Sequence, residues 1–205
     1  MTTTNNNQDF LHKYTVGYMV NALISEKIHY DVYHVQHAFS TAFPDVVWAT
    51  PANALHMTVM QLLAPQVNYG EDKDALFEKV FPTYDPVLHQ VFRHVAPFEI
   101  TFDRLFVSES AIALYGDDKS NALFNEIRQK FLSQIELPPH TDLPPNIAHS
   151  TIIRFVGEIP LEDVQKVADS LQFSITQSID EFRVVRETEL PMLNYSVVKT
   201  YPLSY

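Results

Sequence analysis

Two short stretches of this sequence, HMT from His56 to Thr58 and HST from His149 to Thr151, decide how the rest of it is interpreted. Each stretch lies in an apolar run and is followed directly by an aliphatic residue. Because side chains alternate between the two faces of a strand, each histidine shares a face with the threonine two positions later. The residues between and after them point to the opposite face, where they can pack into a core. The sequence therefore predicts two strands, each with one polar and one apolar face.

Two imidazoles in one cleft suit the cleavage of a phosphodiester. One neutral histidine can accept a proton from the attacking water or hydroxyl, and a protonated one can donate to the leaving oxygen. Threonine hydroxyls can donate hydrogen bonds to the non-bridging phosphate oxygens. We therefore predict that His56 and His149 are catalytic and that Thr58 and Thr151 bind phosphate, with no metal and no other cofactor. Which histidine is the base stays open.

The two motifs occupy corresponding places in two halves of the chain. Strands are expected at 14–20, 55–63, 98–106, 111–115, 147–156, 182–187 and 195–201. Helices are expected at 26–43, at 71–81 and 86–95 with Pro82 and Pro86 interrupting them, at 118–134, and from Pro160 onward. Each half thus has a helix, a loop and a strand that carries the motif. This order predicts an α+β, bilobal, pseudo-two-fold fold, with two antiparallel sheets, helices on their outer faces and a central cleft.

Length and composition limit the class of protein. A chain of 205 residues with 46% hydrophobic residues is long enough for one bilobal domain, expected over 10–205, after a polar disordered tail over 1–9. The absence of cysteine excludes disulfides, thiol nucleophiles and cysteine-bound zinc. No apolar run approaches the roughly 18 residues of a membrane span, and the N-terminus lacks signal-peptide features, so we expect a cytoplasmic protein with no membrane partner. The oligomeric state is not indicated.

The net charge of −11 and the scattered basic residues also argue against long nucleic acid, which usually needs a basic face. A small phosphate ligand needs only a local positive pocket. The expected substrate is therefore a small nucleotide or a short oligonucleotide.

The two motifs and the order of elements resemble those of the 2H phosphoesterases. The stretch HSTIIR from His149 to Arg154 is similar to the form found in the branch named for 2′-5′ RNA ligase and RNA 2′,3′-cyclic phosphodiesterase. The resemblance implies a metal-independent phosphodiesterase whose substrate has a 2′,3′-cyclic phosphate, a 2′-5′ linkage, or a cyclic or short oligonucleotide chain. It also implies that Arg154 contacts phosphate. Strict strand alternation, however, places Arg154 on the face opposite His149, which leaves an ordinary surface arginine as the alternative.

Several other assignments stay open. An aromatic side chain is expected to stack on a nucleobase, and the candidates are Tyr18, Trp48, Phe155 and Tyr195. His34 and His37 have a spacing that could suit a metal, but a solvated helix face is the better interpretation because no further ligand lies nearby. Among functions, the alternatives are a non-catalytic protein that binds a phosphorylated nucleotide in the same cleft, and an adaptor in which the two triplets are accidental.

Overall fold

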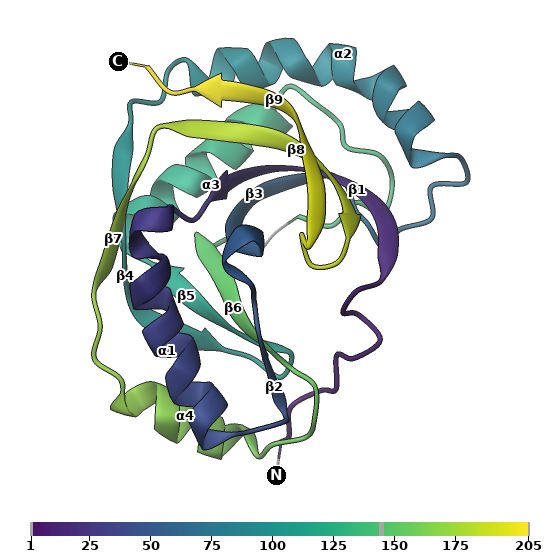
Figure 1. The fold of residues 1–205 in the computed structure, drawn as a ribbon. Helices are drawn as coiled ribbons and strands as arrows, with labels where there is room; N and C mark the ends of the chain where they lie inside the picture. Colours follow the sequence, from purple (N-terminus) through teal and green to yellow (C-terminus); the bar gives the residue numbers. More distant parts are fainter. Residues whose placement is uncertain (1, 144–145, 205) are drawn as a thin grey trace.

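The computed structural model describes residues 2–143 and 146–204, which form two antiparallel sheets with helices on their outer faces (Figure 1). The strands are β1 (Tyr14–Leu23), β2 (Val47–Ala49), β3 (His56–Leu63), β4 (Phe98–Val107), β5 (Ala111–Gly116), β6 (His149–Phe155), β7 (Ile175–Ile179), β8 (Glu181–Glu189) and β9 (Asn194–Pro202). The helices are α1 (His29–Ala42), α2 (Lys73–Phe92), α3 (Asp118–Leu132) and α4 (Leu161–Ser170). The α+β fold with two antiparallel sheets is the one that the sequence predicts.

The two sheets place their motif strands in a similar way. One sheet has the order β3-β1-β8-β9 and the other has the order β2-β6-β5-β4-β7. In each sheet the motif strand pairs with the strand that precedes it across a helix, β1 before α1 for β3, and β5 before α3 for β6. The lobes are nevertheless not the two halves of the chain, because the C-terminal strands β8 and β9 complete the first sheet while the early strand β2 joins the second. β3 and β6 come into contact where the sheets meet.

The helices cover the two sheets unequally. α1 contacts β2, β6 and α4, while α4 also contacts β4, so this pair covers the five-stranded sheet (Figure 1). α2 lies against β1 and β9, and α3 contacts both β3 and β4. α3 therefore touches both sheets. Within the described residues, no helix has the length and apolar character needed to cross a membrane.

The region of residues 71–95 differs from the prediction of two helices. α2 runs without a break from Lys73 to Phe92 with Pro82 and Pro86 inside it. Both prolines are exposed. Each proline removes one backbone hydrogen bond, because it has no N–H to donate. A carbonyl left free on the solvent side of a helix can accept a hydrogen bond from water instead. The prolines therefore do not end the helix, and burial of its other face against β1 and β9 holds it together.

The N-terminal segment makes contacts that composition alone does not suggest. The sequence predicts a disordered tail over 1–9, and the division into tail and domain stays a prediction. In the structure, Thr4 is buried, and its hydroxyl donates to the Gly157 carbonyl and accepts from the Ile159 amide. Asn7 donates to the Phe155 carbonyl. Polar side chains bonded to the backbone of a neighbouring loop, rather than apolar burial, hold this segment.

Each motif strand contains a β-bulge immediately after its threonine. The extra residue is Val59 in β3 and Ile152 in β6, since the residues on either side pair with successive residues of β1 and β5. A bulge shifts the alternation of side chains by one position. Consequently the fifth residue after each histidine, Gln61 in β3 and Arg154 in β6, returns to the histidine face. The two strands accordingly share one burial pattern over their first seven residues.

A buried arginine supports the bulge of β3. Arg128 of α3 is 3% exposed, and its Nε donates to the carbonyl of Val59 at 2.6 Å. Its Nη2 donates to the carbonyls of Thr58 and Ile147, each at 3.2 Å. Ile147 lies just before β6. One guanidinium therefore satisfies the carbonyls that the bulge leaves free and ties the first motif strand to the start of the second.

A buried glutamine has the corresponding place beneath β6. Gln36 of α1 donates through Nε2 to the carbonyls of Ile152 and Thr50, each at 2.8 Å. The Thr50 amide also donates to the Ile152 carbonyl. Each bulge carbonyl thus accepts from a buried polar side chain of the covering helix. The bulges are satisfied parts of the fold rather than irregularities.

Replacing Arg128 with methionine should lower the free energy of unfolding by at least about 2 kcal/mol, because buried carbonyls lose their donor. The measurement is urea unfolding followed by circular dichroism. The control is Lys130→Met, at an exposed position of the same helix, which should stay within about 0.5 kcal/mol of the parent protein. Equal stability of the two variants would show that Arg128 does not support the motif strands.

Candidate active site

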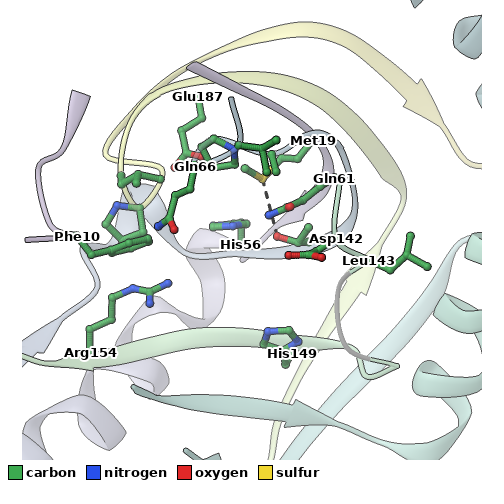
Figure 2. Close-up of a pocket in the computed structure, with 16 residues that line it drawn as sticks. Phe10, Met19, His56, Gln61, Gln66, Asp142, Leu143, His149, Arg154 and Glu187 are labelled. Atoms are coloured by element: carbon green, nitrogen blue, oxygen red, sulfur yellow. Dashed lines mark hydrogen bonds between the residues drawn. The ribbon is translucent and has the colours of Figure 1, made fainter. Parts of the chain in front are cut away.

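The two motif histidines line the same cavities between β3 and β6. A cavity of about 130 Å³ is lined by both histidines and both motif threonines, together with Arg154. A larger cavity of about 390 Å³ shares the two histidines, Thr58 and Arg154, and extends away from β6 toward β8. In Figure 2, His56 lies near the middle of the residues that line the larger cavity, and His149 lies below it on β6. The structure thus brings together His56, Thr58, His149, Thr151 and Arg154.

His56 is held in one orientation by a backbone hydrogen bond. Its Nδ1 lies 2.8 Å from the carbonyl of Ala54 and must carry the proton to donate to it. The neutral ring then has its lone pair on Nε2. Burial lowers the pKa of His56 to about 4, and the positive charges of Arg154 and of a protonated His149 act in the same direction, against the Ala54 hydrogen bond. His56 is therefore neutral near pH 7 in the empty site.

His149 is also neutral near pH 7. Burial lowers its pKa, as do the charges of Arg128 and Arg154, while the Ile147 carbonyl acts in the opposite direction. Its Nδ1 is buried and has no hydrogen bond of normal geometry within the described part of the chain. The Ile147 carbonyl that would accept from it already accepts from Arg128.

Both motif threonines lie on the cavity face of their strands. Thr58 and Thr151 line the smaller cavity. The hydroxyl of Thr58 is 3.8 Å from the sulfur of Met19, which is a weak acceptor. A phosphate oxygen would accept from this hydroxyl more strongly than the thioether does.

Arg154 reaches the cavity, although strict alternation places it on the opposite face from His149. The bulge at Ile152 is the physical reason, because it turns the rest of β6 by one position. The guanidinium carbon lies 4.4 Å from the centre of the Phe10 ring. Burial lowers the pKa of Arg154 to about 10, so the side chain keeps its charge near neutrality. It is a partly desolvated cation in the wall of both cavities.

Buried polar atoms without a partner gather at these cavities. Within the described residues they include Thr50 Oγ1, His149 Nδ1, Arg154 Nε and Glu187 Oε2, and all four residues line one or both cavities. Buried polar groups in folded proteins are nearly always hydrogen-bonded. The walls of these cavities therefore contain an unusual number of buried polar groups.

The residues at this site that the sequence-based set lacks include Gln61, Phe10 and Glu187. Gln61 could have been found, since it occupies the same position after its histidine as Arg154 does, five residues on. Phe10 and Glu187 come from other parts of the chain, the N-terminal segment and β8. No local motif marks either of them, and they join the site only through the tertiary fold.

The four aromatic residues predicted to stack on a base lie elsewhere. Tyr18 is buried against Phe77 with ring centres 3.7 Å apart, and Phe155 is fully buried in the core. Trp48 lies on the short strand β2, and Tyr195 packs beside a small separate cluster that includes Met192. None of the four lines either cavity. The structure therefore brings none of the four to these cavities, and the aromatic residue that lines the larger cavity is Phe10. Stacking of an aromatic side chain on a base stays a prediction.

His34 and His37 do not form a metal site with their neighbours. Both are exposed on α1, and the ring of Tyr33 stacks on that of His37. In the described residues, no group of three or more histidine, aspartate or glutamate side chains is arranged to hold a metal ion. Whether the reaction proceeds without a metal stays a prediction.

Solved structures of several proteins share this fold. The protein TT0787 of Thermus thermophilus matches with a TM-score of 0.63 at 14% identity, over 91% of this chain and 97% of that one. E. coli LigT in its apo form matches with a TM-score of 0.55 at 13% identity, over 94% of this chain and 100% of that one. The MHV ns2 PDE domain matches with a TM-score of 0.51 at 12% identity, over 85% and 99%.

Crystal structures of E. coli LigT also include complexes with 3′-AMP and with phosphate. No protein-family model and no curated protein matches the sequence. At these identities the similarity shows the fold, which is the one implied by the resemblance to 2H phosphoesterases.

The ring of His56 should titrate near pH 4 in the ligand-free protein, because burial disfavours the imidazolium. The measurement is a two-dimensional ¹H–¹⁵N spectrum of the imidazole nitrogens recorded against pH, with the His56→Ala variant to assign the signal. The same signal should show Nδ1 protonated above the transition. A midpoint near the ordinary value of about 6.5 would contradict the buried orientation described for His56.

Proposed function

We propose that this chain is a 2H-type phosphodiesterase that cleaves a nucleotide phosphodiester by general acid–base catalysis, with His56 and His149 as the catalytic pair. The observation that carries the proposal is the convergence of two neutral imidazoles, two threonine hydroxyls and the unpaired cation of Arg154 on one cavity. The LigT complexes with 3′-AMP and phosphate support a nucleotide ligand for this fold.

Phosphate binding prepares the acid. Thr58 and Thr151 donate to the non-bridging oxygens, and the Nη groups of Arg154 offset their negative charge. An anion beside an imidazole favours the charged form of the ring and therefore raises its pKa. The bound phosphodiester thus partly reverses the lowered pKa of His149, and the ring takes up a proton. The empty site holds two neutral histidines and the occupied site holds one neutral and one charged.

The orientation of the His56 ring supports a role as the base. Its Nδ1 donates to Ala54, which leaves the Nε2 lone pair free to remove a proton from the attacking oxygen. That oxygen, from water or from a neighbouring ribose hydroxyl, forms a bond to phosphorus while the bond from phosphorus to the leaving oxygen breaks. His149 gives its proton to the leaving oxygen. Each turnover therefore moves one proton onto His56 and one from His149, and no redox partner is involved.

The size of the cavity and the net charge of the chain favour a small substrate. A cavity of about 390 Å³ lies within the usual range for small-molecule sites. The net charge of −11 disfavours long nucleic acid. We propose a nucleotide with a 2′,3′-cyclic phosphate, a 2′-5′ linkage, or a cyclic or short oligonucleotide chain as the substrate.

A screen of the purified protein against these substrates in excess EDTA should reveal hydrolysis or transesterification. His56→Ala and His149→Ala should each lower kcat by about 10²- to 10⁴-fold, the usual contribution of an acid or base. His34→Ala, an exposed histidine on α1, is the control and should keep full activity.

Two results would contradict this proposal. Loss of activity in EDTA with recovery on adding zinc or manganese would show a metal enzyme. Tight binding of nucleotides with no turnover of any of them would favour the non-catalytic nucleotide-binding protein instead.

A further inference from the structure

The larger cavity has a wall that takes no part in the reaction described above. The smaller cavity already contains both motif histidines, both motif threonines and Arg154, which are the groups that surround the phosphate in the proposed reaction. Other residues line the larger cavity alone, and we refer to them as the outer wall. They include Phe10, Gln61, Gln66, Asp142, Leu143 and Glu187. The part of a substrate that extends beyond its phosphate into the larger cavity therefore contacts the outer wall.

The outer wall offers no cation to an anionic group. Among the described residues that line the two cavities, Arg154 is the single arginine or lysine, and it belongs to the phosphate end. Two members of the outer wall are acids, and Asp142 is an exposed one. Burial raises the pKa of the other, Glu187, to about 7, so this carboxyl is partly charged at neutral pH. The cavity therefore has one positive end and one neutral to negative end.

Gln61 is the counterpart of Arg154 in the first motif strand. Each is the fifth residue after its histidine, and each returns to the cavity face because of the bulge in its strand. Both side chains are partly exposed. In Figure 2, Gln61 and Asp142 lie to the right of His56, while Arg154 lies to the left. Matching positions of the two strands thus present a guanidinium at one end of the site and an uncharged amide at the other.

We propose that Gln61 and Asp142 restrict the substrate to one whose reacting phosphate is its only anionic group in the cavity, a restriction that rests on the proposed function. A glutamine amide can donate to and accept from hydroxyl groups or a base, but it cannot offset the charge of a phosphate as a guanidinium does. The substrates that fit are nucleoside 2′,3′-cyclic phosphates and dinucleoside monophosphates that end in hydroxyl groups. A cyclic dinucleotide or a 5′-phosphorylated nucleotide is disfavoured by its charge and not by its shape.

The test compares each of the four nucleoside 2′,3′-cyclic phosphates with the same compound carrying a 5′-phosphate. The two compounds differ only in the second phosphate, and an ionic strength of about 0.05 M keeps the screening of its charge low. Gln61→Arg places a cation at the position that matches Arg154, and Asp142→Asn removes a carboxylate from an exposed loop. Gln90→Arg is the matched control, because it adds the same charge at an exposed position of α2 that does not line the cavity.

In the parent protein, kcat/KM for the 5′-hydroxyl compound should exceed that for the 5′-phosphate by at least about tenfold, because the outer wall places like charges together. In Gln61→Arg this ratio should fall to within about threefold of one, mainly through a lower KM for the phosphorylated compound, since a guanidinium pairs with phosphate. Asp142→Asn should lower the ratio by about threefold, as expected for an exposed charge. Gln90→Arg should keep the parent ratio.

Calorimetric binding of a nucleoside 3′-phosphate against the nucleoside 3′,5′-bisphosphate gives the same comparison without turnover. A parent ratio near one, or a folded Gln61→Arg variant that keeps the parent ratio, overturns the restriction even if the histidine variants abolish catalysis. If Gln61→Arg does not fold, an unchanged ratio in Asp142→Asn has the same meaning. Absence of turnover of both compounds overturns the proposed function, and the calorimetric ratio then decides the restriction on its own.

Discussion

The hydrogen bonds from buried Arg128 and Gln36 to the bulged carbonyls of the two motif strands are the constraint on which the site depends. A regular strand would keep only the histidine and threonine in the cleft and would turn the next polar residue into the core. The bulge in β6 brings Arg154 to the cavity face, and the bulge in β3 brings Gln61 there. Its cost is one carbonyl in each strand that leaves the ladder, and burial would make an unpaired carbonyl expensive. A polar side chain from each covering helix removes that cost.

The same arrangement sets the electrostatics of the cleft. Histidines, arginines and a carboxyl are partly desolvated together, so burial favours the neutral form of each imidazole and of Glu187. A site with unpaired Arg154 and neutral histidines has a net attraction for an anion before any anion is bound. In the proposed mechanism, a bound phosphodiester satisfies the cation and makes protonation of one imidazole easier. Ligand binding and activation of the acid are therefore one electrostatic event.

The features of the fold and site that depend on local sequence could be predicted. The features that depend on tertiary contacts could not. Strand alternation and the spacing of the two motifs identify His56, Thr58, His149 and Thr151. Hydrophobic periodicity predicts most of the helices and strands. The bulges are invisible locally, because they arise from pairing with β1 and β5 and from donors on distant helices. Helix α2 continues through Pro82 and Pro86 because their side of the helix is exposed, which no proline rule foresees. Phe10 enters the site only because the N-terminal segment folds back onto the end of β6.

The division of roles between His56 and His149 is tested most directly with a substrate in which sulfur replaces the leaving oxygen. A thiolate leaves without being protonated, so the substitution removes the need for an acid but not for a base. On the oxygen substrate, both alanine variants should lose about 10²- to 10⁴-fold in kcat. On the sulfur substrate, His149→Ala should recover to within about tenfold of the parent protein while His56→Ala keeps its full loss. Equal losses for the two variants on both substrates would contradict an acid at His149 and a base at His56.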